Sequence, residues 1–115
     1  MVKETWGVNI FGIRTGDVHF IDGLIGRGGK YKTVAAFLEE ELKGSGLEYD
    51  DDGEYGHDYI GFHPQYQFRK EDDAPHFQNE KEATEYIVRK LEPYTKEDKN
   101  MLSWLVDYYS EPGKN

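Results

Sequence analysis

The negative charge of this chain is concentrated in one short stretch. Nine carboxylates fall between Glu39 and Asp58, and Lys43 is the one basic residue among them, so the stretch carries −8 of a total net charge of −9. A charge run of this kind is most simply a solvated helix end followed by a polar loop. It also creates a negative potential that repels phosphate and attracts basic proteins or cations. The stretch therefore belongs to the surface, and it indicates the kind of partner.

The rest of the composition is that of a folded domain. We expect a single domain over residues 1–115, because this length is close to the common domain size. Aromatic residues make up 15% of the chain, whereas disordered acidic chains are usually poor in them. The absence of cysteine excludes disulfides, thiol catalysis and zinc sites built from cysteine. Met1–Ile13 lacks the pattern of a secretory signal, and no apolar run is long enough to span a membrane. We therefore expect a cytoplasmic protein without a membrane partner.

The spacing of apolar residues predicts an α+β domain. Strands are expected over 5–13, 18–21, 47–49, 58–63 and 65–69. The first two should form a hairpin around the turn Arg14–Asp17. Helices are expected over 33–43, from Asn79 to Leu91, and from Thr95 to about Tyr109, the last two opened by capping signatures. The order β-β-α-β-β-β-α-α predicts a small antiparallel sheet of about four to five strands packed by three helices.

Tyrosines are interleaved with the carboxylates of the acidic stretch. A tyrosine offers a large apolar face and a hydroxyl at low entropic cost, and aromatic residues are enriched at interface hot spots. Carboxylates spaced along such a surface can imitate the phosphates of a duplex and occupy a basic groove. The residues expected to contact a partner are Glu48, Tyr49, Asp50, Asp51, Asp52, Glu54, Tyr55, Asp58 and Tyr59.

A glycine-rich stretch from Gly23 to Thr33 is the second unusual feature. It lies between an expected strand and an expected helix, where backbone amides can cradle an anion. It does not follow the phosphate-loop pattern, since Tyr31 follows Lys30 where that pattern has serine or threonine. A flexible connection is the simplest interpretation. The alternative is an anion site or an arm that contacts a partner, with Arg27, Lys30 and Lys32 as secondary contacts.

Signals for catalysis or metal binding are weak. Glu48, Asp50, Asp52 and Gly53 follow the start of a calcium loop, but Tyr59 stands where that loop needs a bidentate glutamate. The histidines His57, His63 and His76 match no standard metal spacing. No serine has the context of a nucleophile. We therefore predict no catalytic residues, no metal site and no cofactor.

These observations favour a binding protein over an enzyme. The hypothesis is an acidic inhibitor that occupies the basic nucleic-acid-binding groove of a partner protein, either by DNA mimicry or by locking the partner in an inactive shape. The partner would be a basic nucleic-acid-processing enzyme or toxin, and the net charge disfavours direct binding of nucleic acid. In size and acidity the chain is comparable to phage anti-defence inhibitors and to toxin-immunity proteins, an analogy of class without a shared motif.

Two other classes remain open. One is a small metal- or nucleotide-binding enzyme that uses the glycine-rich stretch and the histidines. The other is a structural or assembly protein whose carboxylates only aid solubility. In that class Trp104 and Tyr108, expected on the last helix, would hold a homo-oligomer together, although aromatic residues at helical spacing are more often packed in a core.

Overall fold

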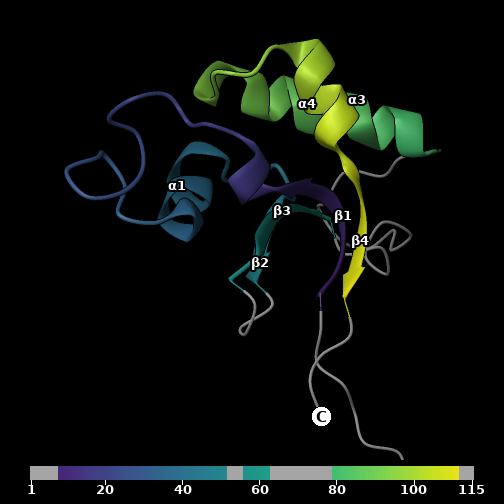
Figure 1. Cartoon of the computed structure of the whole chain (residues 1–115), viewed down its shortest axis with the longest axis horizontal. Helices are drawn as coiled ribbons and strands as arrows, with labels where there is room; N and C mark the ends of the chain where they lie inside the picture. The colour runs from purple at the N-terminus through teal and green to yellow at the C-terminus, as the bar shows by residue number, and fades with distance from the viewer. Residues whose placement is uncertain (1–7, 52–55, 63–78, 112–115) are drawn as a thin grey trace, which may run out of the picture.

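The computed structural model describes residues 8–51, 56–62 and 79–111. Within these residues the fold is α+β, as predicted, with a four-stranded antiparallel sheet and three helices (Figure 1). The strands are β1 (Val8–Arg14), β2 (Glu48–Asp51), β3 (Asp58–Phe62) and β4 (Asp107–Glu111). The helices are α1 (Val34–Glu41), α3 (Glu80–Leu91) and α4 (Lys99–Leu105), with 3-10 turns at Thr15–Asp17 and Glu92–Tyr94.

The sheet has the strand order β2-β3-β1-β4, and every neighbouring pair is antiparallel. The central strand β1 places Phe11 opposite Phe62 and Ile13 opposite Ile60 of β3. Because side chains alternate along a strand, these four residues share one face of the sheet. Both edges of the described sheet are short and acidic strands, β2 and β4.

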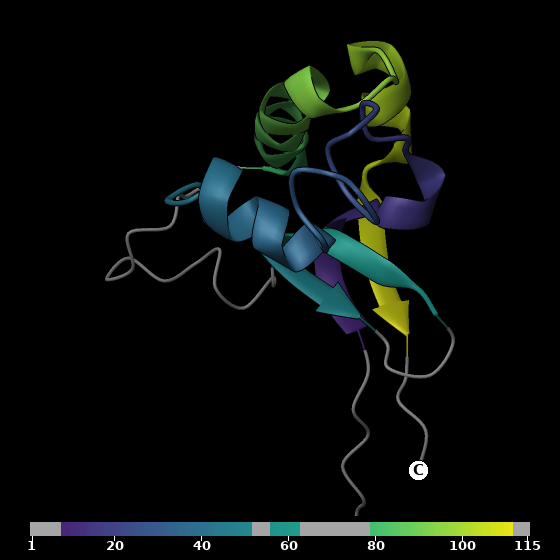
Figure 2. The ribbon, with the colours of Figure 1, turned by 90° about the vertical axis from the view of Figure 1, so that its left-hand side faces the viewer.

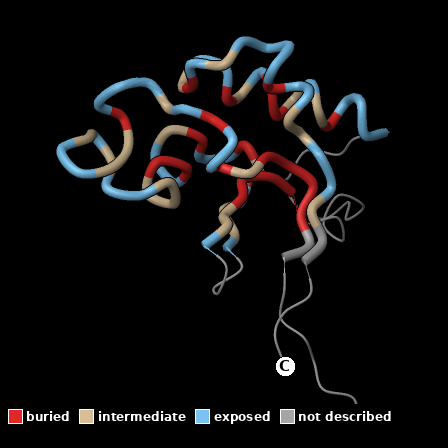
Figure 3. The backbone as a smooth tube through the Cα atoms, in the orientation of Figure 1, coloured by how far each residue is buried: buried red, intermediate tan, exposed pale blue. Residues whose placement is uncertain are grey.

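The helices cover the face that carries Phe11, Ile13 and Ile60. These side chains pack in one buried cluster with Phe37 of α1 and Ile87 of α3, together with further apolar residues of the three helices. Figure 1 shows α3 and α4 lying together across one end of the sheet, while α1 lies beside β2 and β3. Figure 3 shows the buried residues running along β1 and β3 and the inner sides of the helices. The core therefore lies on one side of the sheet.

Each helix begins at a side-chain cap. The side chains of Thr33, Asn79 and Asp98 accept hydrogen bonds from backbone amides three residues further on, at 3.1, 3.0 and 2.8 Å respectively. Such caps satisfy amides that have no partner inside the helix. The cap at Asn79 confirms the prediction. The last helix was predicted to start at Thr95, but the structure starts it at Lys99, because Thr95 is buried and bridges to Phe20.

The opposite face of the sheet carries a second, smaller cluster. Ile10 and Tyr59 are both fully buried there, and the ring of Tyr109 lies 4.9 Å from that of Tyr59. The guanidinium of Arg14 sits 5.9 Å from the Tyr59 ring centroid and 5.8 Å from that of Tyr109. Aromatic rings and a guanidinium at this range attract one another through the ring quadrupole. The cluster ties β3, β1 and β4 together across the sheet.

The predicted hairpin of residues 5–13 and 18–21 is wrong. The places on both sides of β1 are taken by β3 and β4, so the segment after the turn at Thr15–Asp17 leaves the sheet. Phe20 instead makes an antiparallel bridge to Thr95, and the Ile21 amide donates to the Tyr94 carbonyl at 3.0 Å. The residues Arg14–Asp17 predict only that the chain turns there. Which segment then pairs with residues 18–21 depends on residues far away in the sequence.

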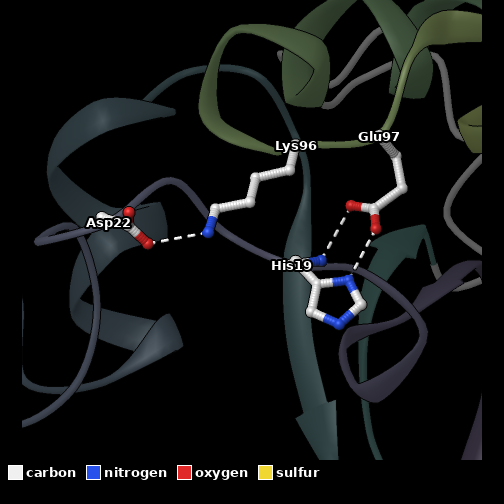
Figure 4. A network of polar contacts seen from close by, with 4 residues as sticks. All are labelled: His19, Asp22, Lys96 and Glu97. Atoms are coloured by element: carbon white, nitrogen blue, oxygen red, sulfur yellow. Dashed lines mark hydrogen bonds and ion pairs between the residues drawn. The ribbon is translucent and has the colours of Figure 1, made fainter.

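Polar contacts fasten this segment to the connection between α3 and α4 (Figure 4). One carboxylate oxygen of Glu97 accepts the backbone amide of His19, and the other contacts its ring nitrogen Nδ1, both at 2.8 Å. Lys96 forms an ion pair with Asp22 at 2.8 Å. Burial alone would raise the pKa of Glu97, but the hydrogen bonds from His19 hold this pKa below its usual value. The carboxylate of Glu97 is therefore a structural contact.

The end of the last predicted helix is also wrong. Helix α4 ends at Leu105, Val106 is extended, and Asp107–Glu111 pairs with β1 as strand β4. Valine and tyrosine favour strands. In addition, β1 offers these residues a strand to pair with, and helical spacing in the sequence cannot reveal such a partner. The predicted strands over 47–49 and 58–63 correspond to β2 and β3. The predicted strand over 65–69 lies outside the described residues.

Candidate functional site

Strand β2 forms one edge of the described sheet and carries part of the acidic stretch. Its register places Tyr49 opposite the core residue Ile60, so Tyr49 and Asp51 face the helix side, whereas Glu48 and Asp50 face the other side. Helix α1 lies alongside β2 (Figure 2), and its last turn carries the exposed residues Glu39 and Glu40. We use the name acidic edge for the carboxylates of these two elements: Glu39, Glu40, Glu48, Asp50 and Asp51.

A groove of about 380 Å³ lies between α1 and β2. Its apolar lining includes Leu38, Leu42 and Leu47, which are themselves at most 9% exposed. Glu39 of α1 and Glu48 of β2 also line the groove, and both are exposed. A groove whose lining combines apolar and charged residues can take a segment of another protein. The acidic edge thus lies beside a groove whose lining is partly apolar and partly charged.

Tyr49, also a lining residue of the groove, is tied to the sheet through Asp58. Its hydroxyl donates to Asp58 Oδ2 at 2.8 Å, and the hydroxyl of Thr15 donates to Asp58 Oδ1. Partial burial and this contact with a carboxylate raise the pKa of Tyr49 to about 12. Asp58 is therefore turned inward as an acceptor for two hydroxyls, and the prediction that it contacts a partner is not supported.

The raised pKa of Tyr49 predicts a loss of stability at alkaline pH. The folded protein favours the neutral phenol, so this contribution is intact below pH 10.0 and declines as the pH rises toward about 12. The decline should amount to at most about 2 kcal/mol in the free energy of unfolding. Tyr49→Phe, which lacks the ionising group, should be about 1 kcal/mol less stable than the original protein at neutral pH.

Urea unfolding of both proteins between neutral pH and about pH 12 checks this prediction. The gap in free energy of unfolding should close as the pH rises, since only the original protein loses the contribution of a neutral Tyr49. A gap that stays constant over this range would show that Tyr49 is not held in its neutral form by the fold.

Another carboxylate of the acidic stretch is neutralised inside the protein. Glu41 accepts hydrogen bonds from the hydroxyls of Tyr31 at 2.6 Å and Tyr94 at 3.3 Å, and it forms an ion pair with Lys30 at 3.0 Å. The contacts from Tyr31 and Lys30 hold the pKa of Glu41 below its usual value. The Lys30 ammonium is thus engaged with Glu41, whereas Arg27 and Lys32 are exposed.

The glycine-rich stretch is an internally bonded loop. The Gly26 amide donates to the Tyr31 carbonyl at 2.9 Å, and the Lys30 and Tyr31 amides donate to Gly23 and Leu24 at 2.9 and 2.8 Å. Leu24 is only 7% exposed, so the loop is packed onto the core. These amides are already used within the loop, and the alternative of an anion cradle is not supported.

The remaining predicted contacts divide into three groups. Glu48, Asp50 and Asp51 are brought together with α1 at the acidic edge, and Tyr49 lines the groove there. Tyr59 has no exposed surface, so the prediction that it anchors a partner is wrong, because the strand alternation turns it into the cluster with Ile10. Asp52, Glu54 and Tyr55 lie outside the described residues. The contribution of α1 and the groove was missed, although Glu39 belongs to the same charge run.

The geometry gives little support to the two alternative functions, a metal- or nucleotide-binding enzyme and a structural or assembly protein. No three histidine, aspartate or glutamate side chains gather as metal ligands in the described part of the chain; His63 and His76 lie outside it. Trp104, expected to be packed, is 84% exposed on α4, and Met101 and Tyr108 are 49% and 47% exposed. Tyr108 belongs to strand β4 and not to the helix, and the exposure of these side chains could not be read from helical spacing alone.

No family model, curated protein or solved structure matches the chain. None of the helices in residues 8–51, 56–62 and 79–111 is long and apolar enough to cross a membrane.

Proposed function

We propose that this protein binds a basic protein through the acidic edge and the groove beside it, and that it inhibits this partner by covering the surface that holds nucleic acid. The observation that carries the proposal is the joint position of Glu39 and Glu48 on the two elements that line one groove. Charge provides attraction and orientation, and the apolar lining provides contact area.

The electrostatics of the acidic edge support a basic partner. Lys43 is the one cation among the described residues that line the groove. The ammonium of Lys30, which is nearby in the sequence, is already engaged with Glu41. Since electrostatic steering raises association rates steeply at low ionic strength, binding should be fast and sensitive to salt.

The partner is proposed to be a nucleic-acid-processing enzyme or toxin of the cytoplasm. Such proteins present lysine and arginine where phosphates bind. A net charge of −9 disfavours binding of nucleic acid by the protein itself, but the protein can compete with nucleic acid for the same cations. The proposed role is thus that of a competitor, without catalysis and without a cofactor.

Competition with DNA tests the proposal. Basic proteins would be captured from host lysate on the immobilised protein at low salt, released at high salt and purified. A fluorescent DNA duplex would then be bound to each of them, and the protein would be added in solution. We expect the DNA to be displaced, with a midpoint that moves to higher protein concentration as salt increases. If none of the captured proteins releases its DNA, the proposed inhibition is wrong.

A further inference from the structure

We propose that two copies of this chain form a dimer in which Trp104 of each copy enters a cavity between α3 and α4 of the other. The surface involved lies apart from the acidic edge: Figure 1 shows α3 and α4 across the top of the sheet and β2 below them. The inference is therefore independent of the proposed function. It is carried by three observations: an exposed indole, a cavity beside it on the same helix, and balanced charge around that cavity.

Trp104 is the most exposed large hydrophobic residue in the described part of the chain. It is 84% exposed on α4, and Met101, about one turn earlier, is 49% exposed. An indole in this position leaves up to about 200 Å² of largely apolar surface in water, and burial of such surface is favourable. Tryptophan is also among the residue types most enriched at interface hot spots. Helix α4 therefore offers an anchor for an interface.

A cavity of about 340 Å³ lies between α3 and α4, and its lining is mostly apolar. On the α4 side it is lined by Asn100 and Ser103, and on the α3 side by Val88 and Arg89. Residues four apart share one face of a helix, so Trp104, four residues after Asn100, stands at the rim of this cavity. Ligand sites usually measure about 300–1,000 Å³, and a single indole is small enough for a site of this size. The same face of α4 thus carries an anchor and a place that can hold one.

An anchor and its receiving cavity on one helix face suit a two-fold symmetric dimer. In such a dimer both copies use the same patch, and each contact occurs twice. If the two α4 helices cross antiparallel, with the symmetry axis midway between Asn100 and Trp104, each Trp104 lies against Asn100 of the other copy. That residue belongs to the α4 side of the cavity. A single crossing of the helices therefore buries both indoles.

The charge around the cavity also fits a second copy. Glu85 and Glu92 contribute two negative charges to its lining, and Arg89 and Lys99 contribute two positive charges, so the patch is neutral. Two molecules that each carry a net charge of −9 repel one another, and they repel least where a neutral patch of each faces the other. A strongly basic partner gains nothing from such a patch, whereas a second copy can place its acids against these bases.

The size of the contact indicates a weak dimer. The two indoles account for about 400 Å² of buried surface. With the residues around the cavity the interface should reach about 1,000 Å², at the low end for specific protein contacts. The dissociation constant should therefore lie at about 10–100 µM. At low micromolar concentration the protein is then a monomer, in which Trp104 stays exposed.

Sedimentation equilibrium of the whole protein from about 1 to 500 µM tests the dimer, because this range brackets the expected dissociation constant. Trp104→Ala should weaken the dimer by at least about a hundredfold, since each dimer loses two indoles. Ile21→Ala is the matched control, because Ile21 is also an exposed apolar residue but does not line the cavity. It should change the dissociation constant by less than about twofold. Added salt should strengthen the dimer by screening the repulsion, whereas it weakens binding of a basic partner.

Further variants test whether Trp104 enters the cavity. Ser103 is exposed and lines it, so Ser103→Phe fills the cavity with a ring and should weaken the dimer by at least about tenfold while Trp104 is kept. Ser103→Ala leaves the cavity open and should change the dissociation constant by less than about twofold. In Trp6→Phe the one tryptophan left is Trp104. Its fluorescence emission should move to shorter wavelength as the concentration rises and the indole leaves water.

A protein that stays monomeric up to about 500 µM would overturn the inference, and so would a dimer that Trp104→Ala leaves unchanged. If Ser103→Phe dimerises as well as the original protein, or if the emission of Trp104 does not move while the dimer forms, the cavity does not hold the indole and the inference is wrong. The proposed function is tested separately, because all these substitutions leave the acidic edge intact. Displacement of DNA should be the same for Trp104→Ala and the original protein.

Discussion

Replacing Gly12 with alanine should destabilise the protein by more than about 3 kcal/mol, a large part of the ~5–15 kcal/mol that holds a typical domain together. Gly12 of β1 and Gly61 of β3 lie directly opposite each other in the centre of the sheet. A Cβ atom at Gly12 would come well within 3.0 Å of the Ile60 carbonyl oxygen and the Gly61 Cα, and the same is true of Gly61 against Phe11 and Gly12. Backbone atoms cannot rotate away as a side chain can, so the strands would have to separate.

Urea unfolding followed by circular dichroism measures this effect. Gly61→Ala should be as harmful as Gly12→Ala, because the close approach is reciprocal. Gly16→Ala is the control, since a Cβ at Gly16 meets open space and its backbone is in a region that alanine adopts. It should change the free energy of unfolding by no more than about 0.5 kcal/mol. If Gly12→Ala is as stable as Gly16→Ala, the pairing of β1 with β3 is not as described.

Phe37→Ala should cost about 3–5 kcal/mol in the free energy of unfolding. Phe37 has no exposed surface, and its ring meets three others edge-on: the ring centroids of Tyr94, Phe20 and Tyr31 lie 4.9, 5.7 and 5.9 Å away. With Phe37 included, the four rings come from four separate segments of the chain. Removing the central ring would leave a cavity between α1, the glycine-rich loop and the connection of α3 with α4.

Thermal and urea unfolding of Phe37→Ala would be compared with those of Trp104→Ala. Trp104 is an even larger aromatic residue on a helix, but it is 84% exposed, so its removal should cost less than about 1 kcal/mol. A cost for Phe37→Ala no larger than that for Trp104→Ala would contradict the central place of Phe37 in the core.

Part of this fold follows from local pattern. The caps and apolar spacing of α1 and α3 are properties of their own residues, and so are β3 and most of β1. The segment 18–21 and the strand Asp107–Glu111 were not predictable in the same way. Both depend on what pairs with β1, and a contact between residues about a hundred positions apart, such as Ile10 with Tyr109, leaves no trace in local spacing.

The candidate site was predictable in its charge and not in its geometry. Asp50 and Asp51 do lie at an edge, but Asp58 and Tyr59 turn inward, because strand register decides which side of β3 each residue faces. The sequence alone does not show that Glu41 makes internal contacts while its neighbours Glu39 and Glu40 stay exposed. Its place on α1 brings it to Tyr31, Lys30 and Tyr94, whereas Glu39 faces the groove. The groove itself requires the packing of α1 beside β2.

Competition with DNA by two matched double variants tests the central claim most directly. Glu39→Lys/Glu48→Lys changes the two carboxylates that line the groove, and Glu85→Lys/Glu92→Lys makes the same change of net charge at exposed positions away from the acidic edge. The midpoint for displacing the DNA duplex from a captured basic partner should rise by about tenfold or more for the first variant and by less than about threefold for the second. Equal midpoints for the two variants would mean that net charge alone attracts the partner, and that the acidic edge is not its binding site.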